Sequence, residues 1–185
     1  QSRLKLGARP EAQPPRTSKL RVRIAPSSQY RRSALVAPDT HTAPLSSDSL
    51  TLDKSSIVAF ASHFDPQPYH LDREAAEQSI FGGLCASGWH IAALATRLVS
   101  ETLIKNGLPF VELLSVGHLK WTRPTFVDEE ISVRITLTEI LNESPIAETY
   151  IQAVDVDVCN GDGAVVATMS ATAAIAQDSD TGEIV

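Results

Sequence analysis

The hydrophobic period of this sequence changes once, from helical to alternating, and that change limits the folds open to the chain. Residues 86–107, ASGWHIAALATRLVSETLIKNG, are helix-forming and apolar on most sides, which is typical of a buried helix. Ser87 or Gly88 would begin this helix, and the Asn106-Gly107 pair would end it. A helix of about 18 residues is about 27 Å long. It therefore needs a large apolar surface to pack against.

Segments of alternating pattern after the helix can supply that surface. Three of them alternate apolar and polar residues, as half-buried strands do: 131–138, 149–158 and 164–176. The NGDG sequence at 160–163 predicts a tight hairpin between the last two. A further strand is predicted at 113–124, where Pro124 ends it. Because an antiparallel sheet needs one face covered, the sequence predicts an α+β domain with the sheet wrapped round the long central helix.

Charge is distributed unevenly along the chain. Residues 1–37 contain nine Lys or Arg and one acidic residue, a formal charge of +8, whereas the rest contains seven basic and 21 acidic residues, a charge of −14. Residues 1–48 are rich in Pro, Ser and Arg without a sustained apolar period, so a mostly disordered extension is predicted there. The folded domain is predicted at 49–177, followed by a tail at 178–185.

These features also bear on compartment and partners. The acid-poor leader resembles an organelle transit peptide, or it is a dispensable extension. Two cysteines without a disulfide framework favour a cytoplasmic protein, with the mitochondrial matrix as the alternative if residues 1–48 are a transit-like leader. No membrane partner is expected, because no stretch approaches the roughly 20 apolar residues of a membrane span. No nucleic-acid partner is expected either, since the acidic body would repel phosphate.

Two shorter helices are predicted before the long one. An apolar stripe at helical spacing predicts the first: Ile57, Phe60, Ala61 and Phe64. Thr51 or Asp53 can cap its start, and the Asp65-Pro66 step ends it. The second helix is predicted at 71–81 with Asp72 as its N-cap.

The candidate chemistry lies between these helices, in the stretch FDPQPYHLD at 64–72. Pro66 and Pro68 predict a rigid, non-helical link that holds Asp65 and His70 at fixed positions. A carboxylate beside an imidazole can activate water or a hydroxyl group. Without further context, such a pair could equally be a turn in which the acid caps a backbone group and the histidine packs.

The start of the long helix adds that context. Ser87 follows His70 by 17 residues, and Gly88 comes next. Free N–H groups at a helix N-terminus can stabilise a developing oxyanion, and a glycine there lets a substrate approach closely. The pattern favours an active site for a carbonyl or thioester substrate.

Residues 60–94, FASHFDPQPYHLDREAAEQSIFGGLCASGWHIAAL, resemble the signature of the MaoC-like dehydratases, which include the R-specific enoyl-CoA hydratases. The matching positions are Asp65, Pro68, His70, Asp72, Phe81 and Gly88. The stretch KWTRPTFVDEEISVRI at 120–135 also resembles that family, and the resemblance extends over about residues 50–176.

This resemblance implies the hotdog fold, and a homodimer or a higher even oligomer with paired sheets. It implies that Asp65 and His70 hold the water that adds to C3 of an enoyl thioester, while Gly88 binds the thioester oxygen. Ser87, Trp89 and His90 are the other expected substrate-binding residues. The substrate would be a thioester of CoA or acyl carrier protein, as in fatty acid metabolism, and no metal or other cofactor is implied.

The sequence departs from the family pattern in three places. Gln67 stands where the family usually has Asn, and Ser87 stands where it usually has His before the glycine. The bulk of Trp89 is expected to narrow the acyl tunnel. The strand that usually precedes the first helix has one candidate here, LRVRIA at 20–25.

Two other functions remain open from the sequence. A thioesterase could use the same fold and helix terminus, although the Pro-x-His-x-Asp motif favours a hydratase. A non-catalytic acyl-binding or structural subunit could use the basic extension for docking. Cys85 is expected to be buried and unreactive rather than a nucleophile, because burial raises the pKa of a thiol.

Overall fold

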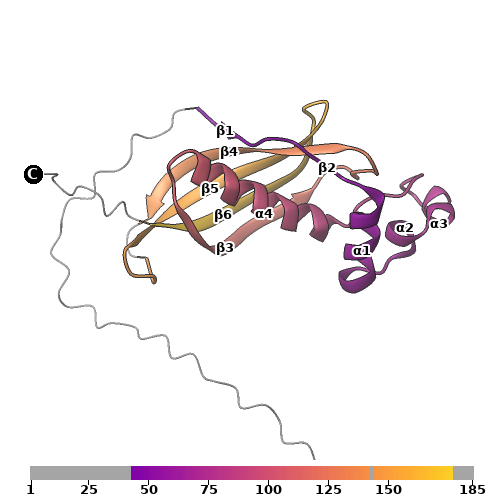
Figure 1. Ribbon diagram of the computed structural model, residues 1–185, viewed down its shortest axis with the longest axis horizontal. Coiled ribbons are helices and arrows are strands. Elements are labelled where there is room, and N and C mark those ends of the chain that lie inside the picture. The colour runs from indigo at the N-terminus through magenta and orange to yellow at the C-terminus, as the bar shows by residue number, and fades with distance from the viewer. Residues whose placement is uncertain (1–42, 142–143, 177–185) are drawn as a thin grey trace, which may run out of the picture. The chain divides into compact units, whose positions relative to one another are not determined.

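An antiparallel sheet with one long helix packed on its face forms the described domain (Figure 1). The computed structural model describes residues 43–141 and 144–176. Four strands of twelve residues build most of the sheet: β3 (Phe110–Trp121), β4 (Glu130–Leu141), β5 (Thr149–Asn160) and β6 (Val165–Ala176). Two short strands, β1 (Leu45–Ser46) and β2 (Leu50–Thr51), pair with β4. The strand order β1-β4-β5-β6-β3 leaves β3 at one end.

The four predicted strands are all present, and their pairing follows from the alternation. Residues that face the helix are buried in β4, β5 and β6, including Val133, Val156 and Met169. The NGDG turn joins β5 to β6 with Gly163 at a φ of +77°, a conformation that glycine adopts at little cost. The prediction of an α+β domain is therefore confirmed.

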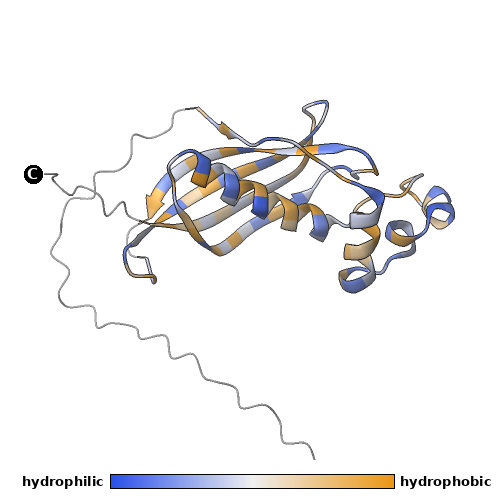
Figure 2. Cartoon of the chain, in the orientation of Figure 1, coloured by the Kyte–Doolittle hydropathy of each residue, from blue (hydrophilic) through white to orange (hydrophobic). Residues whose placement is uncertain are grey.

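The long helix α4 (Gly88–Lys105) begins and ends where the sequence predicts. Ser87 is the N-cap, and Asn106 is the C-cap. Its buried residues pack on the sheet, but the helix is not covered all round, because Trp89 is 59% exposed and Ile104 is 57% exposed. Figure 2 shows hydrophilic and hydrophobic segments alternating along it. The expectation of a helix apolar on most sides was too broad, since the sheet covers only one face.

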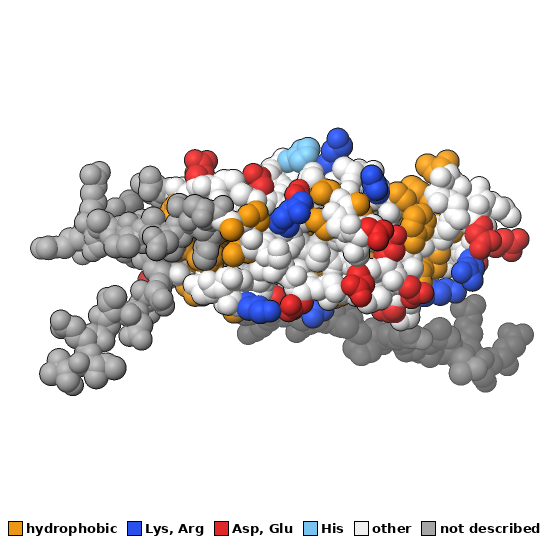
Figure 3. Space-filling model, turned by 90° about the horizontal axis from the view of Figure 1, so that it is seen from above, with side chains coloured by type: hydrophobic (Ala, Val, Ile, Leu, Met, Phe, Trp, Pro, Cys, Tyr) orange, Lys and Arg blue, Asp and Glu red, His pale blue; other side chains and the backbone are white. Residues whose placement is uncertain are grey.

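Charged side chains of both signs are interspersed on the face that Figure 3 shows, with hydrophobic side chains exposed between them. Among the described residues, four ion pairs join Lys or Arg to acidic residues: Arg73–Glu77, Arg97–Glu101, Lys105–Asp48 and Arg134–Asp157. Exposed pairs of this kind contribute at most about 1 kcal/mol each. Among the residues that the structure describes, no helix is long and apolar enough to cross a membrane.

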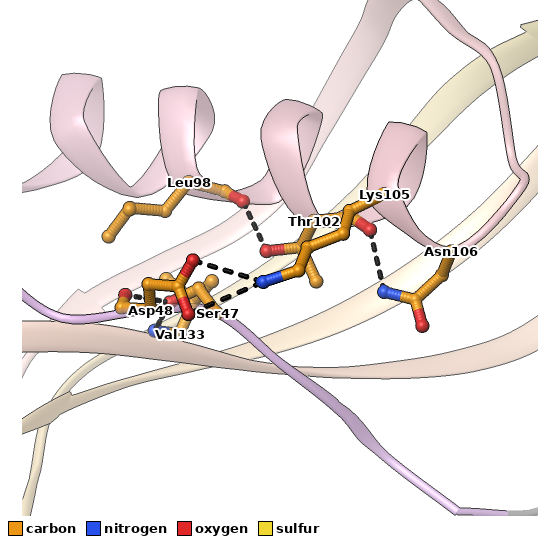
Figure 4. Close-up of polar contacts among 7 residues, drawn as sticks. All are labelled: Ser47, Asp48, Leu98, Thr102, Lys105, Asn106 and Val133. Carbon is orange, nitrogen blue, oxygen red and sulfur yellow. Dashed lines mark hydrogen bonds and ion pairs between the residues drawn. The ribbon is translucent and has the colours of Figure 1, made fainter.

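One of these ion pairs ties the end of α4 to the segment between β1 and β2 (Figure 4). Lys105 Nζ lies 3.1 Å from Asp48 Oδ2, and the Ser47 hydroxyl accepts a hydrogen bond from the Val133 N–H. Leu45 is buried and pairs with Ile135. The predicted domain boundary after residue 48 is therefore too late. Residues 1–42 and 177–185, which include the candidate strand at 20–25 and the predicted C-terminal tail, lie outside the described part of the chain.

In the described part of the chain, three short helices precede α4: α1 (Lys54–Phe64), α2 (Pro68–Leu71) and α3 (Arg73–Glu77). Asp53 caps α1 and Asp72 caps α3, as predicted. The stripe on α1 is only partly buried, because Phe64 is 73% exposed. The second helix was predicted at 71–81, but α3 in that segment is shorter and ends at Glu77.

The prediction of a non-helical link at 66–70 is wrong. Pro68 is the first residue of the helical turn α2, and His70 lies within that turn. Proline suits the first helical position because its missing N–H would have no partner there and its φ already fits a helix. The turn brings His70 back toward the end of α1, where Asp65 lies.

Candidate active site

A cavity of about 370 Å³ lies where the end of α1, the turn α2, the start of α4 and the end of β3 meet. Four of the six predicted site residues line it: Asp65, His70, Gly88 and Trp89. Ser87 contacts Asp65 directly. The wall also contains apolar side chains, so the cavity combines an acid–base pair with space for a hydrophobic group.

Asp65 is held by contacts from two sides. Its Oδ2 atom accepts a 2.7 Å hydrogen bond from the Ser87 hydroxyl and lies 3.5 Å from His70 Nε2. The Ser87 oxygen in turn accepts from the Trp89 N–H at 3.2 Å. A single serine therefore caps α4, as the sequence predicted, and also positions the Asp65 carboxylate, which no sequence pattern had indicated.

The tautomer of His70 follows from its other nitrogen. Nδ1 lies 2.8 Å from the carbonyl oxygen of Cys85, and a carbonyl can only accept, so Nδ1 carries the proton. In the neutral ring, Nε2 is then an acceptor that points toward Asp65. Two acceptors therefore converge on one small region of the cavity, and a water molecule could donate one hydrogen to each.

The start of α4 lines the same cavity. The N–H of Gly88 is the first of the helix and donates to no acceptor among the described residues. The Gly88 carbonyl accepts a 2.8 Å hydrogen bond from Trp121 Nε1, so the indole lies directly against this residue. A Cβ atom on Gly88 would lie 2.7 Å from Trp121 Cε2, which explains why a glycine stands here.

Comparison with known proteins agrees with this arrangement. A family model described as MaoC like domain matches residues 36–158. The chain belongs to the MaoC-like domain family.

Individual relatives and solved structures extend the comparison. A MaoC-like dehydratase from Rhodospirillum rubrum is 35% identical, with a TM-score of 0.63 over 72% of this chain and 90% of that one. The R-hydratase PhaJ1 from Pseudomonas aeruginosa is 20% identical, with a TM-score of 0.57 over 74% of this chain and 83% of that one, which supports the fold alone. The uncharacterized protein YdeM from Bacillus subtilis is 32% identical over 97 residues, 52% of this chain and 66% of YdeM. The predicted hotdog fold is confirmed.

His90 does not line the cavity of this MaoC-like domain, in contrast to the prediction. It is buried on α4, and its ring stacks on Phe60 of α1 with centroids 4.6 Å apart. Its Nδ1 atom is buried without a hydrogen-bond partner. His90 follows Gly88 by two residues and so lies on another side of the helix, which the motif alone could not reveal.

The burial of His90 predicts that the domain becomes less stable in mild acid. Burial lowers the pKa of His90 below its ordinary 6.5, with the charge of Asp53 acting in the opposite direction. As the pH falls below 6.5, His90 takes up a proton in the unfolded chain before it does so in the folded domain. The free energy of unfolding therefore decreases as the pH falls from 6.5 to the lowered pKa of the folded domain. Urea midpoints measured at pH 7.5 and 5.0 should differ more for the wild type than for His90→Phe. The exposed control His63→Phe should behave like the wild type, and equal shifts in all three proteins would contradict the prediction.

Cys85 lies in the cavity wall but is poorly suited to nucleophilic chemistry. Burial raises the pKa of its thiol, which disfavours the reactive thiolate. Within 43–141 and 144–176, no group of three or more His, Cys, Asp or Glu side chains is placed to hold a metal ion.

Several cavity residues were not predicted as site residues. The cavity is also lined by Tyr69, Trp121, Arg123 and Thr125. Apart from Tyr69, they come from the end of β3 and the loop after it. The KWTRP stretch at 120–124 was a signal for them, because it belongs to the second segment that resembles the family, but that resemblance assigned no role to its residues.

Proposed function

We propose that this chain is a hydratase that adds water across the double bond of an enoyl thioester, and that it catalyses the reverse dehydration of a 3-hydroxyacyl thioester. The proposal rests on one observation. The carboxylate of Asp65 and the Nε2 atom of His70 converge in a cavity at the N-terminus of α4. Membership of the MaoC-like family supports the same assignment.

In the proposed reaction, a water donates its hydrogens to Asp65 and to His70 Nε2, which leaves an oxygen lone pair free for C3. As the C3–O bond forms, one water proton passes to the acid–base pair and the double-bond electrons move toward the thioester carbonyl. A proton then passes from the pair to C2, so the pair returns to its starting state. General acid–base catalysis of this kind typically contributes 10²–10⁴-fold in rate.

The negative charge that develops on the thioester oxygen needs donors that are already in place. The Gly88 N–H is free to donate, and the helix dipole of α4 favours negative charge at its N-terminus. Oriented donors of this kind act most strongly on charge that develops in the transition state. Together these groups supply base, acid and oxyanion donor, so the proposed step uses only residues of this chain.

The test follows the absorbance of the conjugated enoyl thioester with crotonyl-CoA as substrate. Loss of the absorbance with formation of 3-hydroxybutyryl-CoA is the expected result. Release of free CoA from a saturated acyl-CoA without hydration would instead indicate a thioesterase. Absence of turnover with short and branched enoyl-CoA substrates would refute the proposal and favour a non-catalytic acyl-binding subunit.

We also propose that the chain forms a homodimer through the free edge of β3. Within residues 43–141 and 144–176, this strand pairs with β6 on one side only, and long unpaired edges promote pairing with another chain. Beside it, an apolar groove lies between α4 and the sheet, lined by Trp89, Ala92, Ala93, Thr96, Val116, Leu119 and Met169. A second copy would cover both features.

Substitution of Val116 by Lys should therefore convert the dimer to monomer in light scattering. Val116 is 46% exposed on β3, and a charge there would be buried in the pair at substantial cost. Ile80→Lys is the matched control, because Ile80 is an exposed apolar residue away from this edge. A wild-type monomer, or a Val116→Lys dimer, would contradict the prediction.

A further inference from the structure

Arg123 is a basic residue in the cavity wall that has no acidic partner in the described part of the chain. It lies two residues beyond β3, and its side chain is exposed at the cavity. None of the described ion pairs includes it. Its backbone position is well defined, because the N–H groups of Thr122 and Arg123 both donate to the Val166 carbonyl and Pro124 restricts the conformation of the residue before it, Arg123.

The other basic residues of the domain make this feature distinctive. Seven Lys and Arg residues lie between 38 and 185. Within the described residues, four of them form ion pairs with acidic side chains: Arg73, Arg97, Lys105 and Arg134. Of the three others, Lys54 lies outside this cavity. Lys120 lies on the opposite face of the sheet, since its neighbours Leu119 and Trp121 pair with buried residues that face α4.

We propose that Arg123 is a specificity-determining residue that binds a second anionic group carried by the substrate. The inference rests on the proposed function for the class of substrate, an acyl thioester. A guanidinium offers several donors in a planar fork that matches a carboxylate or a phosphate, and both groups can occur in such a substrate. A carboxylate would belong to the acyl chain, and a phosphate would belong to the carrier arm.

The layout of the cavity is consistent with an anion at its entrance. Ala86, Ile91 and Val166 are buried in the wall and offer no polar side-chain atom, so they suit the hydrocarbon part of an acyl group. Arg123 is exposed and can meet a charged group without complete loss of hydration. Asp65 is the acidic residue of the cavity wall, and the hydroxyl of Ser87 already engages its Oδ2 atom.

The test measures binding of three saturated ligands with no anionic group, with anionic groups on the carrier arm, or with one on the acyl chain. Butyryl-pantetheine has no anionic group, butyryl-CoA adds the phosphates together with the adenosine, and glutaryl-pantetheine adds only an acyl carboxylate. Both tryptophans of the chain, Trp89 and Trp121, line the cavity, so intrinsic fluorescence reports on binding. Arg123→Gln removes the charge, Arg123→Lys keeps it without the fork, and Lys120→Gln is the matched control.

Arg123→Gln should weaken binding of an anionic ligand by about tenfold or more, as expected for a lost charge-assisted hydrogen bond, and leave butyryl-pantetheine unchanged. The affinity of Arg123→Lys for the anionic ligand should lie between those of the wild type and Arg123→Gln. The affinity of Lys120→Gln should match that of the wild type. If Arg123→Gln weakens binding of butyryl-CoA alone, the group that Arg123 binds is a phosphate of the carrier arm. If it weakens binding of glutaryl-pantetheine alone, that group is a carboxylate of the acyl chain.

Three outcomes would overturn the inference. The wild type and Arg123→Gln could bind all three ligands equally, the substitution could weaken binding of all three by the same factor, or the wild type could bind none of them. Because the readout is binding, it is separate from turnover. A failure to hydrate crotonyl-CoA would refute the proposed function. The difference in affinity between charged and uncharged ligands would still decide whether Arg123 binds an anionic group.

Discussion

Replacement of Asp65 by Asn should lower kcat/KM for hydration of crotonyl-CoA by about 10²–10⁴-fold, the usual contribution of a general acid–base group. The amide has nearly the shape of the carboxylate and can still accept the Ser87 hydrogen bond, so the cavity should keep its form. It cannot take a proton from water, however. Initial rates from the enoyl absorbance would measure the loss.

Asp72→Asn is the matched control for this substitution. Asp72 caps α3 and does not line the cavity, and Asn caps a helix about as well as Asp, so activity and stability should both be retained. Ser87→Ala should lose less activity than Asp65→Asn, because it removes a hydrogen bond to the carboxylate and leaves the carboxylate itself. Near-wild-type activity in Asp65→Asn would show that Asp65 is not the base.

Replacement of Gly88 by Ala should impair both folding and activity. The new methyl group would lie 2.7 Å from Trp121 Cε2 and 2.8 Å from Nε1, so the indole has to move and its hydrogen bond to the Gly88 carbonyl is lost. Overpacking of this kind typically costs about 1–3 kcal/mol in the free energy of unfolding. Urea unfolding would measure that cost, and a shift in tryptophan fluorescence would report the displaced ring.

Two controls separate this clash from a general effect of Ala. Gly161→Ala should be tolerated, because a Cβ there meets only Glu130 Cβ at 3.8 Å. The Gly88→Ala change should also cost much less in a Trp121→Ala background, since the atoms it meets are gone, and a double-mutant cycle isolates that coupling. A Gly88→Ala protein as stable and active as the wild type would exclude a close approach at this residue.

The elements of this fold follow from local patterns in the chain. The bounds of α4 were predictable because Ser87 can cap it and Asn106-Gly107 can end it. The strands were predictable because the alternation in β4, β5 and β6 requires one buried face. Proximity of Asp65 to His70 was also predictable, because only four residues separate them. The helical turn that contains His70 was missed, because Pro68 was taken to break a helix when it begins one.

Only the tertiary structure decided which distant residues meet at the site. Trp121 and Arg123 reach the cavity because β3 pairs with β6 in a register that brings its end to the start of α4. The Ser87 contact with Asp65 joins residues 22 positions apart in the sequence. His90 lies outside the cavity because α4 is oriented so that this side chain faces Phe60 of α1. Periodicity and capping act within a few residues, so the sequence determined the helices, the strands and the acid–base pair. Strand register and helix rotation depend on packing across the whole domain, and they decided what surrounds that pair.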